Sequence, residues 1–253
     1  MEPLEKLSVV VPVYNGAKSL KILCENIFDS STGCFGQVEI ILVDDGSRDE
    51  SYRVMKELRN SDSRIKLIKL KKNSGQQNAT FCGMQFAEGD IIATIDDDLQ
   101  HPPEILGLMK AEMDKGAELV FAVPEKPAHR WYRRLGSKLT FLAFNSILKT
   151  KKPVRISSCR MFDSRIKAGL KKNDSGFVYV SAELIKRTSK IAWIDLRHEE
   201  RAHGQSNYTL ASLLKIFAKL VIHYSDFRVL KIFRKRGKLY EIENLEMGDG
   251  SRL

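Results

Sequence analysis

Three consecutive carboxylates, Asp96, Asp97 and Asp98, follow a nearly apolar run at residues 90–95 (DIIATI). Alternate side chains of a strand share a face, so we expect Asp96 and Asp98 to point one way and Asp97 the other. With the amide oxygen of Gln100 just beyond, they offer an oxygen-only site for Mg²⁺ or Mn²⁺, which would take further ligands from a substrate diphosphate. The alternative is that the acids only stabilise the N-terminus of the next helix. Three adjacent carboxylates at the end of a buried strand favour the metal site.

Two more carboxylates, Asp44 and Asp45, end another apolar run in the stretch VDDGSRDES. Carboxylates at this place in nucleotide-binding folds accept hydrogen bonds from ribose hydroxyls or from a base N–H. The alternative is turn and capping chemistry alone, which we assign to Ser47 and Asp49. Ser47 and Glu50 also have the spacing of a capping box at the start of a helix. We therefore expect Asp44 and Asp45 to face a ligand.

The elements that must position these residues alternate along the first half of the chain. Apolar runs predict strands, and helical spacing predicts helices between them; the strands are 7–13, 38–43, 65–70, 90–95 and 117–123, and the helices 17–29, 48–59, 76–87 and 102–115. This alternation is typical of an α/β fold with a mostly parallel sheet flanked by helices. Ligands of such sheets bind beyond the carboxyl ends of the strands. Four of those ends, PVYNG, VDDGS, KKNSGQQN and DDDLQ, are therefore expected to form one site.

Charge divides the 253 residues, whose net charge is +10, into three parts. Residues 1–128 carry 15 Lys and Arg against 21 Asp and Glu, a net charge of −6. Residues 129–238 carry 26 against 7, a net charge of +19, and residues 239–253 carry 1 against 4. The acidic part suits a metal or a hydroxyl-rich ligand, and the basic part suits phosphates, nucleic acid or an anionic membrane. No recognisable nucleic-acid-binding module is present, so we expect no nucleic-acid partner.

Two basic stretches, 130–149 and 209–236, combine aromatic and aliphatic residues with Lys and Arg at helical spacing. Such helices usually pack an apolar stripe on the core and expose the charged face. Their composition also suits helices that lie in a membrane interface, and this is the reading we favour. No run of about 18 apolar residues predicts a membrane-spanning helix, and we expect no secretion signal. The four cysteines lack zinc-site spacing and are expected to be free thiols in a reducing cytosol.

The chain resembles the inverting nucleotide-sugar glycosyltransferases of family 2, which have the GT-A fold. The stretches that carry the resemblance are VVVPVYNG, ILVDDGSRDES, NSGQQNATFCGMQFAEGD, IDDDLQHPPEI, SSCRMFDSRI and HEERAHGQSNYTLASLLK. The last two narrow it to the branch that contains dolichyl-phosphate mannose synthase and bacterial polyprenyl-phosphate (undecaprenyl-phosphate) glycosyltransferases. We expect residues 1–208 to form the catalytic domain, with an interfacial helix at 130–149. Residues 209–238 would be a basic helical extension and 239–253 a frayed polar tail.

The resemblance assigns roles to matching residues. Binding of the nucleotide is expected from Pro12, Tyr14, Asn15, Asp44, Asp45, Gln76, Asp96 and Asp97. The metal ligands would be Asp96, Asp98 and Gln100, and the catalytic residues Asp96, Asp98 and Arg201. The phosphate of the acceptor would contact Arg133, Arg134, Lys138, Arg201, Ser206 and Tyr208.

The implied reaction moves a sugar from a nucleotide donor, UDP-linked in our expectation, to a polyprenyl phosphate in bacterial surface-glycan synthesis. A lipid phosphate is already anionic, so no strong general base is needed. The metal and basic side chains would stabilise the departing nucleoside diphosphate and align the attacking phosphate oxygen. The protein is then expected to be cytoplasmic and peripherally associated with the inner face of the cell membrane.

Two features depart from the relatives. Where they often read G-x-S-K, residues 204–207 read GQSN, so one expected phosphate cation is missing. Either Arg201 and His203 would compensate for it, or the acceptor would differ. Many members of the branch also continue into two membrane-spanning helices, whereas residues 233–253 here read FRKRGKLYEIENLEMGDGSRL. We therefore expect either a naturally soluble variant or one that reaches the membrane through a membrane-anchored partner or a second copy of the chain.

Two other functions stay open. Transfer to a sugar hydroxyl of a lipid-linked or surface glycan would require a general base, for which Glu183, Asp195, Glu199 and Glu200 are the candidate acids. A non-catalytic protein that only binds nucleotide sugars is the third hypothesis. Intact acids at every expected metal position argue against it, because a site without catalysis has no need of adjacent repelling charges.

Overall fold

The computed structural model describes residues 5–102, 104–124, 154–170, 176–196, 218–224 and 237–247. The first half alternates strands and helices: β1 (Lys6–Val13), α1 (Leu20–Ser31), β2 (Gln37–Asp44), α2 (Ser51–Ser61), β3 (Ile65–Leu70), α3 (Gln76–Phe86), β4 (Ile91–Thr94), α4 (Ile105–Asp114) and β5 (Leu119–Pro124). The later part adds β6 (Arg160–Asp163), α6 (Ser164–Lys167), α7 (Val180–Ile185), β7 (Ile191–Leu196) and β8 (Ile242–Glu246). The five strands and four helices predicted for the first half are confirmed, with ends that differ by at most three residues.

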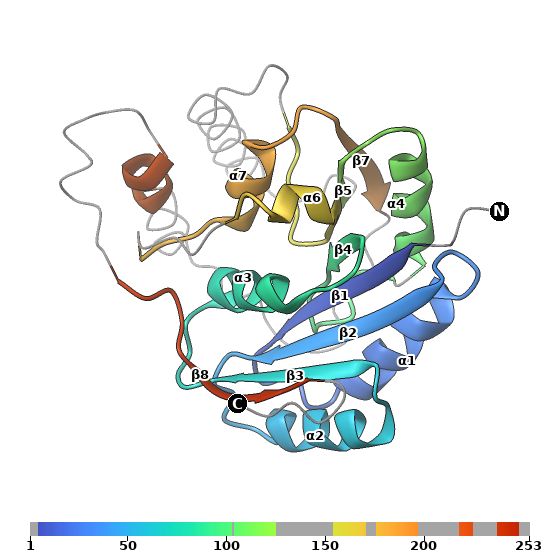
Figure 1. Cartoon of the computed structure of the whole chain (residues 1–253). Helices are drawn as coiled ribbons and strands as arrows, with labels where there is room; N and C mark the ends of the chain where they lie inside the picture. Colours follow the sequence, from blue (N-terminus) through green and yellow to red (C-terminus); the bar gives the residue numbers. More distant parts are fainter. Residues whose placement is uncertain are drawn as a thin grey trace, which may run out of the picture.

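The described strands form one sheet in the order β7-β5-β6-β4-β1-β2-β3-β8 (Figure 1). Strand β1 runs parallel to β2 and β4, β2 is parallel to β3, and β5 is parallel to β7. Strand β6 lies antiparallel between β4 and β5, and β8 pairs antiparallel with the edge of β3. The sheet is therefore mostly parallel, as predicted, and the carboxyl ends of its six parallel strands share one edge.

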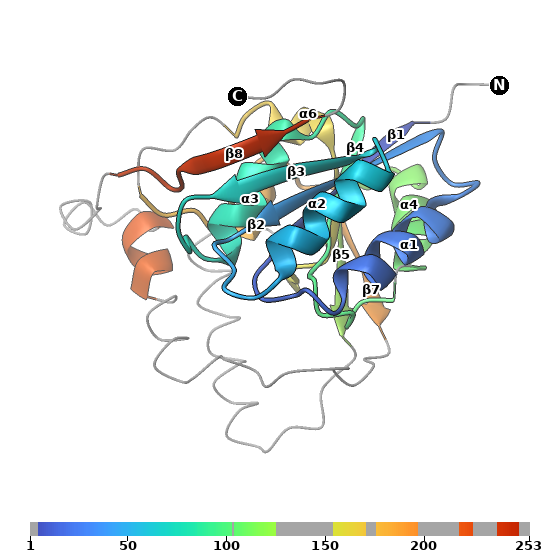
Figure 2. The same cartoon turned by 90° about the horizontal axis from the view of Figure 1, so that it is seen from below.

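Alternate side chains of the central strands pack on opposite faces of the sheet. Val10 of β1 belongs to the cluster covered by α3 and α7, whereas Val9 and Val11 belong to the cluster covered by α1, α2 and α4. Helices α1 and α2 lie in front of the sheet and α3 lies behind it when the molecule is seen from below (Figure 2). Burying one aliphatic or aromatic side chain contributes about 1.5–3 kcal/mol. Continuous apolar strands thus fix the sheet between two helical layers.

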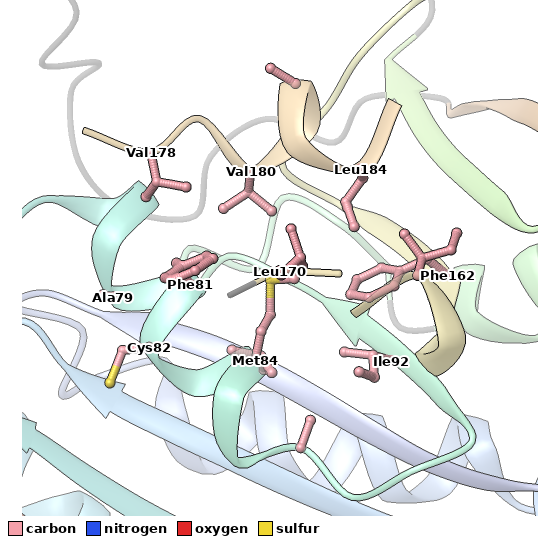
Figure 3. Close-up of a cluster of buried hydrophobic side chains, with 14 of the residues drawn as sticks. Ala79, Phe81, Cys82, Met84, Ile92, Phe162, Leu170, Val178, Val180 and Leu184 are labelled. Carbon is pink, nitrogen blue, oxygen red and sulfur yellow. The ribbon is translucent and has the colours of Figure 1, made fainter. Parts of the chain in front are cut away.

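Helix α3 lies unusually close to the sheet. A Cβ atom on Gly83 would come within 2.5 Å of Val10 Cγ1 and 2.8 Å of Val43 Cγ2, so only glycine fits there. On its other side, Phe81 and Met84 of α3 face Val180 and Leu184 of the α7 region (Figure 3). This packing fixes the start of α3 beside the carboxyl ends of β1, β2 and β4.

The polar segment at the end of the described chain is ordered, and its predicted fraying is wrong for residues 242–246. Strand β8 pairs with β3, opposite Leu67 to Leu70, and buries Leu245. Its acids match the lysines of β3, since Lys69 Nζ lies 2.8 Å from Glu243 Oε1. The composition resembles that of a solvated tail because an edge strand needs only one buried apolar residue, Leu245, and charge pairs with its neighbour.

Residues 130–149, and most of 209–236, lie outside the described residues. The described part, residues 218–224, is helical and buries Leu220 and Tyr224 against the core. This turn therefore packs on the protein with its apolar side. Among the residues that the structure describes, no helix has both the length and the apolar character needed to cross a bilayer.

Candidate functional site

The carboxylate of Asp96 is held by two neutral donors at the carboxyl end of β4. Its Oδ1 accepts a hydrogen bond from Gln76 Nε2 at 2.6 Å, and its Oδ2 accepts one from Ser158 Oγ at 2.6 Å. Gln76 is the first residue of α3, and Ser158 lies just before β6. Three segments far apart in the sequence therefore fix the orientation of this one side chain.

Asp97 has different hydrogen-bond partners from Asp96. Asp97 Oδ2 accepts a hydrogen bond from the backbone N–H of Tyr14 at 3.1 Å, and its backbone oxygen accepts one from Ser19 Oγ at 2.5 Å. A Cβ on Gly16 would overlap the Asp97 carboxylate, so glycine is required for this contact. Burial raises the pKa of Asp97 to about 6, against the lowering effect of the Tyr14 hydrogen bond. Asp97 thus supports the loop after β1 that carries the expected base-binding residues.

Asp45 joins two loops of the same edge. Its carboxylate is 3% exposed and accepts hydrogen bonds from the backbone N–H groups of Ser74 (2.6 Å) and Gly75 (2.9 Å). Burial raises the pKa of Asp45 to about 6, and the neighbouring charge of Asp44 also raises it. Asp44 is fully buried, and its Oδ1 accepts a hydrogen bond from the Ser47 N–H at 3.0 Å. The two acids therefore hold the loops that follow β2 and β3 in place.

The end of β1 and the loop after it carry the other expected nucleotide contacts. Pro12 is buried, whereas Tyr14 is 43% exposed, and Asn15 adopts a φ of 57°. The Asn15 N–H donates to Ser47 Oγ at 3.0 Å, and Asn15 Oδ1 accepts from the Arg48 N–H at 2.8 Å. Tyr14 is therefore the aromatic side chain that this loop offers to a ligand at the surface.

The capping box predicted for Ser47 and Glu50 is wrong. The Ser47 hydroxyl is used by the loop after β1, and Glu50 forms no side-chain hydrogen bond as the N-cap of α2. Asp49 supplies the turn chemistry instead, because its Oδ1 accepts hydrogen bonds from the N–H (3.0 Å) and Oγ (2.5 Å) of Ser51. Sequence spacing alone did not distinguish a cap from a contact between loops.

The expected metal ligands fit a hard cation by their chemistry. Asp98 and Gln100 are partly exposed next to Asp96, and Asp98 Oδ1 accepts a hydrogen bond from the Gln100 N–H at 3.1 Å. Leu99 between them has a φ of 59°, which turns the chain at this point. Within the described ranges, no three His, Cys, Asp or Glu side chains are placed to share a metal. Mg²⁺ that is bound mainly through a diphosphate needs only one or two carboxylates, so this donor set is sufficient.

Sequence reasoning missed the contact made by Ser158. Its stretch, SSCRMFDSRI, supported only the family resemblance, and no local spacing relates position 158 to position 96. The two meet because β6 pairs antiparallel with β4, with Arg160 opposite Thr94. A pair of serines one residue before the short strand β6 (RMFD) was the one signal available.

The candidate acids for a general base that the structure describes both have basic partners. Glu183 Oε2 lies 2.8 Å from Arg187 Nη1, and its Oε1 accepts a hydrogen bond from Tyr224 OH at 2.7 Å. Asp195 Oδ1 lies 2.5 Å from Arg155 Nη1. Outside the described residues lie Glu199, Glu200 and the expected acceptor-phosphate contacts Arg133, Arg134, Lys138, Arg201, Ser206 and Tyr208.

Comparison with known proteins gives a family match and close relatives. Residues 8–168 match the family model described as Glycosyl transferase family 2. Over 239 residues the chain is 32% identical to undecaprenyl-phosphate 4-deoxy-4-formamido-L-arabinose transferase of Edwardsiella ictaluri, covering 91% of this chain and 72% of that protein. The transferase of the same name from an Enterobacter species is also 32% identical, over 240 residues, covering 92% and 72%.

Solved structures show the same fold at lower identity. Glucosyl-3-phosphoglycerate synthase from Mycobacterium tuberculosis was crystallised with Mn²⁺, UDP and phosphoglyceric acid. It matches with a TM-score of 0.57 and 16% identity, covering 86% of this chain and 76% of that chain.

Proposed function

Since the chain belongs to glycosyl transferase family 2 and has the GT-A fold, we propose that it transfers a sugar from a UDP-sugar donor to a polyprenyl phosphate in a metal-dependent, inverting reaction. The observation that carries this proposal is the Asp96 carboxylate, which Gln76 and Ser158 orient at the carboxyl end of β4 beside Asp98. That edge of the sheet is where ligands of parallel α/β folds bind.

The donor half of the proposal rests on the acidic edge of the sheet. Asp96, Asp98 and Gln100 would hold Mg²⁺ or Mn²⁺, and Tyr14 would contact the base. Bound there, the ion would supply positive charge that stabilises the departing nucleoside diphosphate. Asp96 keeps its orientation without the ligand because both of its oxygens already accept hydrogen bonds. A carboxylate that is already oriented loses little conformational freedom when it binds the metal, and this favours the transition state.

The acceptor half rests on the named relatives and on charge. The relatives' names specify undecaprenyl phosphate, an anionic lipid. The segment 129–238 with its net charge of +19 would attract such a phosphate at the cytoplasmic face of the membrane. Candidates for this contact remain Arg133, Arg134, Lys138, Arg201, Ser206 and Tyr208. A phosphate acceptor needs no strong general base, in keeping with the ion pairs that engage Glu183 and Asp195.

The test is a panel of nucleotide sugars incubated with a short-chain polyprenyl phosphate, with and without EDTA. We expect a lipid-linked sugar from a UDP donor, and we expect EDTA to abolish it. Asp98→Asn should reduce the rate at least about 100-fold, since it removes one charged ligand of the metal. Asp29→Asn, an exposed acid on α1, is the matched control and should retain the wild-type rate. Product formation that persists in EDTA and in the Asp98 variant would contradict the proposal.

A further inference from the structure

Arg160 of β6 is the largest side chain that is wholly buried in the described part of the chain, with 1% exposure. Its Nε donates to Thr94 Oγ1 and to the backbone oxygen of Ser158, both at 3.1 Å, and its Nη1 donates to Ser181 Oγ at 2.8 Å. All three acceptors among the described residues are neutral oxygens. Burying a charged group without an opposite charge costs several kcal/mol, whereas an apolar residue of similar volume would not incur this cost. Packing alone therefore does not explain an arginine here.

The hydrogen bonds of Arg160 lead to Asp96 through Ser158. The Ser158 backbone oxygen accepts from Arg160 Nε and also from Thr94 Oγ1 at 2.5 Å. The hydroxyl of the same serine donates to Asp96 Oδ2. Thr94 itself ends β4, two residues before Asp96. The guanidinium thus ties the strand that carries Asp96 to the segment that supplies one of its two donors.

The other end of the guanidinium connects to the second donor. Ser181 lies in the first turn of α7, whose first residue, Val180, donates its N–H to Gln77 Oε1 at 2.9 Å. Gln77 follows Gln76, the second donor to Asp96. Figure 3 shows this part of α7 lying directly over α3. Both hydrogen bonds to Asp96 therefore belong to one framework, and Arg160 is the cation that it contains among the described residues.

Electrostatics supports this arrangement. Burial lowers the pKa of the Arg160 guanidinium, while Tyr179 and, after it, Asp96 act in the opposite direction, so Arg160 and Asp96 attract each other. An arginine stays protonated even when buried, because its ordinary pKa is so high. The Arg160 guanidinium, on the strand that pairs with β4, therefore stays positively charged.

We propose that Arg160 is a positioning residue that acts through Ser158 to hold the Asp96 carboxylate in the orientation that receives the metal and the donor diphosphate. The proposal rests on the function proposed above for the same site. It distinguishes Arg160 from a core residue, whose replacement would change stability without changing ligand affinity.

Crystal structures of variants test the positioning directly and without any ligand. In Arg160→Lys, which keeps the charge but cannot reach all three acceptors, the Ser158 Oγ to Asp96 Oδ2 distance should open from 2.6 Å to beyond about 3.5 Å. Ser181→Ala removes only one hydroxyl at the far end of the guanidinium, and we expect the same change in smaller measure. An unchanged contact in either variant would overturn the proposal. If Arg160→Lys does not fold, the crystal structure of Ser181→Ala tests the positioning role by itself.

Calorimetric titration with UDP and Mn²⁺ then tests the consequence for binding. Loss of a residue that orients a metal ligand lowers affinity about 10–100-fold, and we expect about tenfold for Arg160→Lys and for Ser158→Ala. The double variant should lose no more than either single variant, because both changes break the same link. Losses that multiply, or an Arg160→Lys chain that binds like the wild type, would refute the link.

Lys66→Met provides the matched control. Lys66 is also a buried cation, but it lies at the opposite edge of the sheet, with its Nζ 2.9 Å from Glu39 Oε2. Its replacement should lower the melting temperature and leave the affinity for UDP with Mn²⁺ within about twofold, and its effects should add to those of Ser158→Ala. A wild-type chain that binds no UDP with Mn²⁺ would contradict the proposed donor, while the crystal structures would still decide the role of Arg160.

Discussion

Carboxylates at the amino ends of the parallel strands (the amino edge) have different partners from those at the carboxyl ends (the carboxyl edge). At the amino edge, Glu39 Oε2 lies 3.0 Å from Lys6 Nζ and 2.9 Å from Lys66 Nζ, and Glu88 Oε2 lies 2.9 Å from Lys66 Nζ. Ser8 Oγ completes the cluster with a 2.5 Å hydrogen bond to Glu39 Oε1. Each acid of this cluster is thus neutralised by a lysine.

At the carboxyl edge the acids accept hydrogen bonds from neutral groups. Asp45 and Asp97 accept them from backbone N–H groups, and Asp96 accepts them from an amide and a hydroxyl. The hydrogen bonds of Asp96 lead to the cation Arg160 only through Ser158. This edge therefore keeps net negative charge that a bound cation can neutralise.

The pKa shifts record the same contrast. Burial acts to raise the pKa of Glu39, but hydrogen bonds from Ser8, the Glu88 backbone, Lys66 and Lys6 together hold it below its ordinary value. Burial raises the pKa of Asp45 and of Asp97 to about 6, since their neutral donors do not outweigh it. Lysines and hydrogen bonds thus favour the charged form of Glu39 at the amino edge, whereas burial disfavours the charged forms of Asp45 and Asp97 at the carboxyl edge.

Replacement of Asp96 should separate activity from stability most strongly. Asp96→Asn keeps the shape of the side chain and removes its charge, so we expect kcat/KM for sugar transfer to fall about 1000-fold, or about 4 kcal/mol. The melting temperature should change little, because the lost charge was not paired with a cation. Enzyme assays and calorimetry on the same preparation measure both quantities. A large loss of stability with modest loss of activity would reverse the roles assigned to the two edges.

Replacement of Glu39 should give the opposite result. Glu39→Gln leaves Lys66 buried with only the exposed Glu88 as its partner, and breaking a buried pair costs about 3 kcal/mol. For a chain of this size the melting temperature should fall by about 6–12 °C. The rate of sugar transfer at 25 °C should stay within about twofold of wild type, because the site lies at the other edge. Glu57→Gln, which breaks an exposed pair with Arg53, is the control and should cost below about 0.5 kcal/mol.

The first half of the fold could be predicted because its signals are local. Apolar runs and helical spacing gave β1 to β5 and α1 to α4 directly. Strand β8 could not be predicted, since its five residues include two acids and one buried leucine, and its partner strand lies more than 170 residues earlier in the chain. Pairing with the lysines of β3 is what makes that composition stable as a strand.

The residues of the site likewise divide into those that the local sequence predicts and those that it does not. The acids at the strand ends were visible as charges that interrupt apolar runs. Their partners were not, because the contacts of Asp96 with Ser158 and of Thr94 with Arg160 depend on the antiparallel insertion of β6. The same holds for Ser47, which has the spacing of a cap but serves Asn15. Local pattern finds the charged groups, and tertiary pairing decides what holds them.

The pH dependence of stability should differ in sign between the two edges. The pKa of Asp97 is about 6 in the folded chain and about 3.9 in an unfolded one, so the folded chain binds more protons between these values. Its contribution to stability is therefore present below about pH 4 and is lost as the pH rises through 6. Asp97→Asn should be more stable than wild type at pH 7, by on the order of 1 kcal/mol, and equal to it near pH 4.

Urea denaturation in EDTA at pH 4, 5.5 and 7 measures this difference. Glu39→Gln provides the opposite trend in the same experiment. The lowered pKa of Glu39 means that its contribution is present above its unfolded pKa and is lost as the pH falls through the folded value. The deficit of that variant should thus be largest at pH 7 and shrink toward acid pH. An Asp97→Asn chain that is less stable than wild type at pH 7 would show that the acid is needed for the loop after β1.

The ion pair between Lys69 and Glu243 should contribute the least. It is as short as the pairs of the amino edge, at 2.8 Å, but its side chains are 27% and 48% exposed. Water screens such a pair, so Glu243→Gln should cost below about 0.5 kcal/mol, and about 0.5 M NaCl should remove the difference from wild type. Strand β8 would stay in place through its backbone pairing with β3 and the burial of Leu245. A cost above about 1.5 kcal/mol in urea denaturation would mean that charge pairing holds this strand. Burial would then not explain why Glu39 contributes more to stability than an exposed acid.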